Sequence, residues 1–127
     1  MKKRLLLVDD DPAVRRMLFR LLTDEDYSVS LACTGREAIK LASTADLVLL
    51  DLNLPVEDEW ETFERITADR PLLPVILITA RPTQLAALTP RAGALMDKPL
   101  DLPKLLRTIR ELLEESTEHR LARLDGN

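Results

Sequence analysis

The fold of this chain is indicated first by residues 5–12, which read LLLVDDDP. Four consecutive apolar residues suit a strand that is covered on both faces, as in a parallel sheet. The acids that follow end the strand, and Asp11 before Pro12 is typical of a helix N-cap and first helical residue. The stretch therefore predicts a strand, a polar turn and a helix, in that order.

Three further apolar runs and one alternating run extend this pattern along the chain. The runs at residues 47–50, 75–78 and 94–96 predict buried strands, because each is short and unbroken. Residues 28–31 alternate between polar and apolar side chains, which is typical of an edge strand with one wetter face. Together with residues 5–8, these segments predict a sheet of five strands.

The intervals between the strands carry apolar residues at the three- and four-residue spacing of buried helix faces. Five helices are expected. The first begins at Pro12, the second at Thr34, and the third contains Trp60. The fourth falls within residues 82–89, and the fifth begins near Asp101. We expect the last helix to run through Leu113 and to continue through Leu121 and Leu124. Strand and helix therefore alternate five times, which predicts an α/β fold with helices on both faces of one doubly wound sheet.

The composition is that of an ordinary globular chain. The 127 residues suit one domain, with 46% hydrophobic and 31% charged residues. The single cysteine, Cys33, cannot form an internal disulfide, so we expect a reducing, cytoplasmic compartment. A net charge of −4 argues against a nucleic-acid surface, and the apolar run at residues 5–8 is too short for a signal peptide or a membrane span.

Polar side chains stand where the predicted strands end. The first strand is followed by Asp9 and Asp10, the third by Asp51, the fourth by Thr79 and the fifth by Lys98. Because ligands of doubly wound sheets bind at the carboxyl ends of the strands, we expect these side chains to converge. Carboxylates from two strands need a cation to offset their repulsion, and Mg²⁺ prefers such oxygen ligands. With a hydroxyl and a lysine, the set is typical of phosphoryl transfer onto an aspartate.

Four motifs in succession resemble those of the receiver domains of two-component response regulators. They read LLVDDD at residues 6–11, VLLDLNLP at 48–55, PVILITA at 74–80 and GALMDKP at 93–99. The signal comes from the presence of all four in order, each at a strand end. The resemblance spans about residues 3–113 and implies the flavodoxin-like (βα)5 three-layer fold, with five parallel strands in the order 2-1-3-4-5.

The resemblance implies a role for each acidic residue at the strand ends. Asp51 would be the phosphoacceptor, taking a phosphoryl group from a sensor histidine kinase or a histidine phosphotransfer domain. Asp9 and Asp10 would bind Mg²⁺ together with Asp51 and the backbone carbonyl of Asn53. The chain would then be a phosphorelay signalling domain, with no enzymatic activity beyond its own phosphorylation and dephosphorylation.

The same resemblance assigns the two remaining polar residues and a partner surface. Thr79 would bind a phosphoryl oxygen, and Lys98 would pair with the phosphoryl group, aimed by a cis Lys98–Pro99 bond. Phosphorylation would switch the binding of a downstream partner on the face formed by the fourth helix, fifth strand and fifth helix. A homodimer through this face is implied by resemblance alone, and we expect no direct contact with nucleic acid or membrane.

The length leads to an expectation about domain organisation. We expect residues 1–127 to form a single receiver domain with its core at about residues 3–115. Residues 116–127 would extend the last helix or begin a linker. Because no output domain fits in this length, we expect a stand-alone regulator or the receiver part of a longer one.

Three features depart from the family pattern that the motifs resemble. Leu95 stands where the family usually has an aromatic residue that moves inward on activation. The acids at residues 57–59 fall where the loop after the acceptor usually has an apolar residue and a glycine. The interval from Thr79 to Lys98 is shorter than expected, which shortens the fourth helix. These departures suggest an intact phosphorylation site with modified output machinery.

Two alternatives to phosphorylation signalling stay open. A receiver-like interaction module that works without phosphorylation is favoured by Leu95 and the short fourth helix. A phosphatase of the haloacid dehalogenase type also uses an aspartate nucleophile and Mg²⁺. That family has a second acid two residues after the nucleophile, where this chain has Asn53.

Several other residues are expected to be structural. We expect Cys33 to be a small packing residue, Trp60 to pack on the third helix, and His119 to be exposed to solvent. The basic residues of the last helix are interspersed with acids and are expected to form a solvated helix face: Arg107, Arg110, Arg120 and Arg123.

Overall fold

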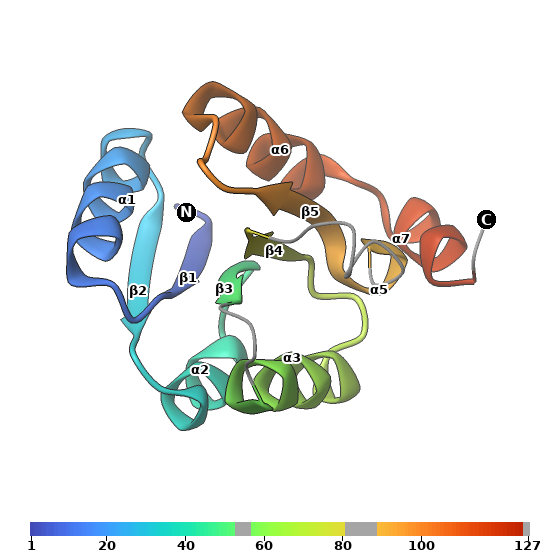
Figure 1. Ribbon diagram of the computed structural model, residues 1–127. Helices are drawn as coiled ribbons and strands as arrows, with labels where there is room; N and C mark the ends of the chain where they lie inside the picture. The colour runs from blue at the N-terminus through green and yellow to red at the C-terminus, as the bar shows by residue number, and fades with distance from the viewer. Residues whose placement is uncertain (53–56, 81–88, 126–127) are drawn as a thin grey trace.

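The computed structural model describes residues 1–52, 57–80 and 89–125 (Figure 1). The strands are β1 (Arg4–Val8), β2 (Ser28–Ala32), β3 (Leu47–Leu52), β4 (Val75–Thr79) and β5 (Gly93–Asp97). The helices are α1 (Pro12–Asp24), α2 (Gly35–Ala42), α3 (Glu57–Asp69), α5 (Thr89–Ala92), α6 (Leu102–Glu114) and α7 (Thr117–Leu124). Strand and helix alternate along the chain as the sequence predicts.

The five strands form one parallel sheet in the order β2-β1-β3-β4-β5, which confirms the expected strand order. The edge strand β2 carries more exposed residues than its neighbours, in agreement with its alternating sequence. The central strands β3 and β4 are buried along their whole length. Each strand runs in the same direction, so all five carboxyl ends meet at one edge of the sheet.

Helices cover both faces of the sheet and define two apolar cores (Figure 1). Alternate strand residues point to opposite faces, so the consecutive residues Leu5 and Leu6 belong to different cores. The core of Leu5 includes Leu18 of α1 and Leu105 of α6, whereas the core of Leu6 includes Phe63 of α3. Burying each such side chain contributes about 1.5–3 kcal/mol, which explains why the strands are continuous apolar runs. The three-layer architecture is therefore confirmed.

Helix caps agree with the sequence. The side chain of Asp11 accepts a hydrogen bond from the backbone N–H of Ala13 at 2.9 Å and caps α1. Thr34 caps α2 and Asp101 caps α6 in the same way. Each cap pairs a backbone N–H that the first helical turn leaves without a partner. The polar turns after β1 and β5 are thus fixed at the edge where the strands end.

The last helix differs from its expected length. Helix α6 ends at Glu114, and Glu115 has an extended backbone with ψ of 135°. Ser116 then caps a separate helix, α7, by accepting a hydrogen bond from the N–H of His119. The expectation of one helix continuing through Leu124 was therefore wrong, because a serine N-cap starts a new helix at this point. The helix expected within residues 82–89 lies outside the described residues except for Thr89, which begins α5.

The basic residues of α6 and α7 behave in two different ways. Arg107, Arg110 and also His119 are exposed, as expected. Arg120 and Arg123 are half-buried and hydrogen-bonded to backbone carbonyls and to an acid, so the expectation of a wholly solvated face was wrong. Across the described ranges, no helix has the length and apolar character needed to span a membrane.

Candidate functional site

The strand-end residues that the sequence singled out come together at one edge of the sheet. Asp9 directly follows β1, Asp51 is the second-last residue of β3, Thr79 is the last of β4, and Lys98 directly follows β5. Strand register places Thr79 opposite Leu52, next to Asp51 in the chain. Asp9, Asp51 and Thr79 are all buried, with 4%, 5% and 1% of their surface exposed. Burial of three polar side chains at one edge marks this edge as the candidate site.

Lys98 forms an ion pair with Asp51. Its ammonium Nζ lies 3.0 Å from Oδ2 of Asp51 in hydrogen-bond geometry and 2.8 Å from Oδ1. Only Oδ2 has the geometry of a hydrogen bond, but both oxygens lie within ion-pair distance of the ammonium. Buried carboxylates are normally paired, and the lysine supplies the partner of this one.

The backbone around Lys98 fixes where its side chain starts. The N–H of Lys98 donates to the carbonyl oxygen of Thr79 at 3.0 Å, which continues the strand pairing beyond β5. The Lys98–Pro99 peptide bond is cis, as the resemblance implied. These contacts place the lysine at the same sheet edge as Thr79, with 35% of its side chain exposed. The ammonium can therefore reach both the buried acid and a ligand arriving from solvent.

Asp9 is the second buried acid of the site. The pKa of Asp9 is raised to about 6, mainly by burial and to a smaller extent by the charge of Asp51 and a hydrogen bond with it. The N–H of Asp11, 2.9 Å from Oδ1 of Asp9, and the charge of Lys98 act in the opposite direction. Two acids in contact cannot both ionise without cost, and a bound cation would remove that cost. The electrostatics of the edge therefore favour a divalent cation.

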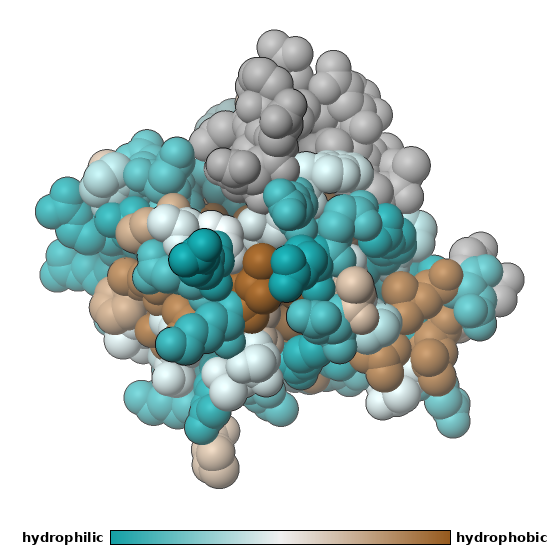
Figure 2. Space-filling view, turned by 90° about the horizontal axis from the view of Figure 1, so that it is seen from below, coloured by the Kyte–Doolittle hydropathy of each residue, from teal (hydrophilic) through white to brown (hydrophobic). Residues whose placement is uncertain are grey.

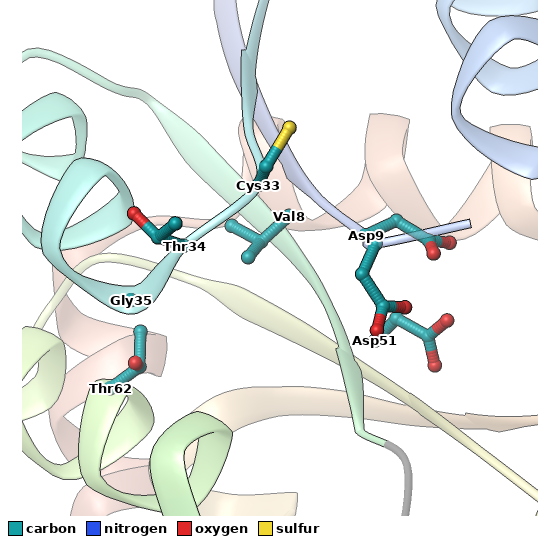
Figure 3. Close-up of a pocket in the computed structure, with 8 residues that line it drawn as sticks. Val8, Asp9, Cys33, Thr34, Gly35, Asp51 and Thr62 are labelled. Carbon is teal, nitrogen blue, oxygen red and sulfur yellow. The ribbon is translucent and has the colours of Figure 1, made fainter. Parts of the chain in front are cut away.

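A hollow of about 200 Å³ opens beside the two acids (Figure 3). It is lined on the acidic side by Asp9, Asp10 and Asp51 and on the other by Cys33 and Thr62, among others. Figure 3 shows the Asp9 and Asp51 side chains next to each other, with the threonine of α3 on the far side of the hollow. Cys33 is exposed, so the expectation that it is a small packing residue was wrong. Its place after the edge strand β2 leaves its thiol uncovered.

A second hollow, of about 440 Å³, flanks the acids on the side of α1 and α6. This hollow is lined by Asp51 and Lys98 and by apolar residues. The apolar residues come from both helices and from the loop before α6, and they include Met17 and Leu100. Met17 is 44% exposed although it lies on the apolar stripe of α1. The buried acid pair is thus flanked by a hollow on each of two sides.

Two residues near the site were not anticipated. Arg15 of α1 donates from Nη1 to the backbone carbonyl of Asp9 at 2.9 Å, which holds the turn between β1 and α1. Thr62 of α3 is 2% exposed and lines the hollow. Neither position has a sequence signal of its own, because Arg15 lies on a polar helix face and Thr62 falls within an amphipathic pattern. Their roles depend on packing between elements.

The departures from the family pattern fall in distinct places. Leu95 lies in the middle of β5, opposite Leu77 of β4, and packs half-buried against the core under α2 and α3. Residues 57–59, expected in a loop, form the first turn of α3 instead. Acidic residues suit the N-terminal turn of a helix, where the helix dipole is positive. The backbone there is therefore regular despite the unusual composition.

The residues present fit a magnesium ion only if other ligands complete its coordination. Within the described ranges, no three acidic, histidine or cysteine side chains gather into a complete metal site. Mg²⁺ commonly takes only one or two carboxylates, with water and phosphate oxygens filling the other positions. The burial of Asp9 and Asp51 side by side and the raised pKa of Asp9 both favour a further positive charge at this edge. Asn53, a further ligand implied by resemblance, lies outside the described residues.

A family model of the response regulator receiver domain matches residues 5–110. The chain therefore belongs to the receiver domain family of two-component signalling, whose members are signalling domains. Among curated relatives, response regulator MprA of Mycolicibacterium vanbaalenii is 38% identical over 122 residues, covering 92% of this chain and 53% of MprA. Transcriptional regulatory protein GlrR of Escherichia coli is 37% identical over 117 residues, covering 88% of this chain and 26% of GlrR. The chain thus spans about half of one relative and a quarter of the other.

Solved structures of receiver domains share this fold. A CheY-like receiver domain protein from Methanospirillum hungatei is 30% identical with a TM-score of 0.79, over 90% of this chain and 95% of that one. Response regulator TrrA of Thermotoga maritima, in complex with Mg²⁺ and BeF, is 30% identical with a TM-score of 0.75, over 87% and 98%. The receiver domain of a Pseudomonas aeruginosa sensor histidine kinase, with magnesium in its active-site cleft, is 25% identical with a TM-score of 0.79, over 91% and 100%. Magnesium binding is thus a feature of relatives with this fold.

Proposed function

We propose that this chain is a Mg²⁺-dependent phosphoacceptor whose phosphorylation at Asp51 switches the binding of a partner. The observation that carries the proposal is the Asp51–Lys98 pair, in which both oxygens of a buried carboxylate lie within 3.0 Å of a lysine ammonium where the strands end. A carboxylate can act as a nucleophile toward phosphorus, and the cation beside it offsets the negative charge of the incoming group. The two hollows beside Asp51 leave space for a phosphoryl donor.

In the proposed reaction, a carboxylate oxygen of Asp51 attacks the phosphorus of a phosphohistidine in a histidine kinase or phosphotransfer domain. The bond between the histidine nitrogen and phosphorus breaks as the bond between the aspartate oxygen and phosphorus forms, so the histidine nitrogen keeps the electron pair. The product is an aspartyl phosphate and a free histidine. Lys98 and Thr79 stabilise the negative charge on the phosphoryl oxygens, one as a cation and one as a hydrogen-bond donor.

The magnesium ligands in this proposal are Asp9, Asp10, Asp51 and the backbone carbonyl of Asn53. When bound, the ion neutralises charge on the acids and on the transferred group. Asp9 holds its carboxylate in place through the N–H of Asp11. Arg15 steadies the same turn from α1. The chain's own contacts therefore orient the acidic ligands before a cation arrives.

The proposal extends to the organisation of the chain and its partners. Residues 1–127 form one receiver domain, and a histidine kinase or phosphotransfer domain delivers the phosphoryl group in the cytoplasm. The downstream partner binds the face formed by the fourth expected helix, within residues 82–89, together with β5 and α6, and this face also offers a surface for homodimers. Direct binding to nucleic acid or membrane forms no part of the proposed activity. Phosphorylation would change the populations of two conformations of this face, and the partner would bind one of them better.

Intact mass after incubation with acetyl phosphate and Mg²⁺ tests the proposal. The wild-type protein is expected to gain one phosphoryl group, and Asp51→Asn is expected to gain none. Omitting Mg²⁺ should suppress the gain in the wild type. No gain in the wild type, or an equal gain in Asp51→Asn, would overturn the proposal.

A phosphorylation-independent interaction module is the second candidate, and the observation in its favour is Leu95. A leucine, half-buried against the core, stands where the family usually has the aromatic residue that moves inward on activation. Against this stands the grouping of Asp51 and Lys98 within an ion-pair distance, which a scaffold does not need. Titration with Mg²⁺ and beryllofluoride, followed by NMR, separates the two functions, because a scaffold should show no saturable shift.

A further inference from the structure

Helix α7 is fastened to the domain by an acid between two arginines. Arg123 of α7 donates from Nη1 to both carboxylate oxygens of Glu115, at 2.6 Å for Oε1. Its Nε also donates to the backbone carbonyl of Pro90 in α5 at 3.2 Å. About a fifth of each side chain is exposed, 21% for Arg123 and 19% for Glu115. A charge-assisted pair with this much burial is stronger than an ordinary surface ion pair.

Arg120 fastens α7 at two more places. Its Nη2 donates to the carbonyl of Leu112 near the end of α6 at 2.9 Å, and its Nη1 to the carbonyl of Leu72 before β4 at 3.4 Å. Its Nε lies 3.6 Å from the carboxylate of Glu115. Carbonyls in the last turn of a helix need donors, and a cation there also suits the helix dipole. Two arginines therefore connect α7 to α5, α6 and the turn before β4.

This position places α7 on one end of the face proposed for partner binding (Figure 1). Helix α7 contacts α5, and the groove between β5 and α6 is lined by Gly93, Leu112, His119 and Arg123. Seen from below, apolar side chains gather at the right of the molecule (Figure 2). On α7 itself, Leu121 is 48% exposed. The helix thus occupies part of the α5, β5 and α6 surface.

Helix α5 depends on its neighbours for its position. With four residues, it is too short to be stable alone. Arg91 of α5 pairs with Glu64 of α3 at 3.1 Å and lies 5.5 Å above the ring of Phe63. The short helix is therefore contacted by α3 through Arg91 and by α7 through the carbonyl of Pro90. Loss of either contact should loosen the chain leading into β5.

We propose that α7 is a strap whose Glu115, Arg120 and Arg123 contacts hold α5 and the start of β5 in one arrangement and oppose phosphorylation. The opposition to phosphorylation rests on the proposed function of Asp51. The strap holds one of the two conformations, and occupancy of Asp51 favours the other. Linkage between the two requires that loosening the strap increases the affinity of the Asp51 site for a phosphoryl mimic.

The test compares the full chain with Arg123→Ala and Glu115→Gln, using Arg107→Ala as the control because Arg107 is exposed on α6. Hydrogen exchange read by mass spectrometry is expected to speed up in residues 117–124 and also in residues 89–97 in both strap variants. Binding of beryllofluoride with Mg²⁺ is expected to tighten about five- to tenfold in the same variants. The control should leave exchange and affinity unchanged. Glu115→Gln supplies a second, nearly isosteric variant if Arg123→Ala folds poorly.

Faster exchange confined to residues 117–124, with residues 89–97 and the affinity unchanged, would overturn the strap. Unchanged exchange in α7 itself would overturn it too. If the wild type binds no beryllofluoride, the proposed function of Asp51 fails. In that case hydrogen exchange alone tests the strap. The strap is then retained as a structural restraint only if exchange speeds up in residues 89–97 of the strap variants.

Discussion

The ammonium of Lys98 reaches Asp51 across an intervening strand. Lys98 follows β5 and Asp51 lies in β3, and the sheet places β4 between them, yet Nζ lies 2.8 Å from Oδ1. The contact requires the three strands to end at the same edge and the lysine to extend along that edge. It joins the buried acid to the end of β5, so the proposed acceptor and the face proposed to be held by α7 meet at one side chain.

Removing the lysine ammonium should slow phosphorylation without unfolding the domain. Lys98→Ala is expected to lower the rate with acetyl phosphate on the order of 10²-fold, because a fixed positive charge at the transferred group is lost. The rate is followed by intact mass over time, with Lys104→Ala as the control, since Lys104 is an exposed lysine of α6. Equal rates for Lys98→Ala and the wild type would contradict the role of Lys98.

The raised pKa of Asp9 predicts a specific dependence of stability on pH. Because the folded-state pKa is about 6 and the reference value is 3.8, the folded state binds more protons than the unfolded state between these values. Without Mg²⁺, Asp9 should therefore lower the free energy of unfolding as the pH rises from about 4 to 6. Asp9→Asn removes this penalty and should stabilise the protein at pH 7 by about 1–3 kcal/mol.

Urea unfolding at pH 4.5 and pH 7 measures this difference, with Asp46→Asn serving as a control at an acid away from the site. The gain from Asp9→Asn should be large at the higher pH and small at the lower one. Parallel stability profiles for the two proteins across this range would show that Asp9 is not held at an elevated pKa.

Magnesium should stabilise the wild type by neutralising the buried acids. At a concentration 100 times the dissociation constant, a ligand of the native state alone adds about 2.7 kcal/mol. Thermal unfolding with and without Mg²⁺ is expected to show this increase in the wild type and a smaller one in Asp10→Asn. A chelator should reverse it. An equal increase in both proteins would remove Asp10 from the proposed ligands.

The Arg91 contact should report on the link between α3 and α5. Arg91→Ala is expected to lower the free energy of unfolding by about 1 kcal/mol, because an exposed ion pair and a cation–π contact each contribute about 0.5–1 kcal/mol or less. Trp60, the single tryptophan, lies 6.2 Å from Phe63, so its fluorescence should shift in the same variant. Arg65→Ala, at an exposed arginine of α3, is the control, and identical spectra for both variants would contradict the link.

Much of the fold and of the candidate site follows from the sequence. Apolar runs identify the parallel strands, and residues after those runs must meet at one edge, which is how Asp9, Asp51, Thr79 and Lys98 were found together. Caps at Asp11 and similar positions were also predictable, since their side chains act on the local backbone.

The contacts between elements were not predictable in the same way. Cys33 appeared to be a packing residue because small apolar side chains usually are, but its exposure depends on how β2 meets α2. The charges around Arg120 alternate in sign, which predicts a solvated helix face. Arg120 instead donates to the backbone carbonyls of Leu112 and Leu72, and no sequence pattern marks these carbonyls as its partners. Ser116 did carry a signal, since a serine after two acids is a good N-cap and marks the end of α6.

The central claim is that the carboxylate of Asp51 accepts the phosphoryl group. Borohydride reduction of the acetyl-phosphate-treated protein converts an aspartyl phosphate to homoserine, and peptide mass spectrometry then locates the modified residue. We expect homoserine at position 51 in the wild type with Mg²⁺ and at no position when Mg²⁺ is omitted. Homoserine at another aspartate, with Asp51 unmodified, would contradict the account.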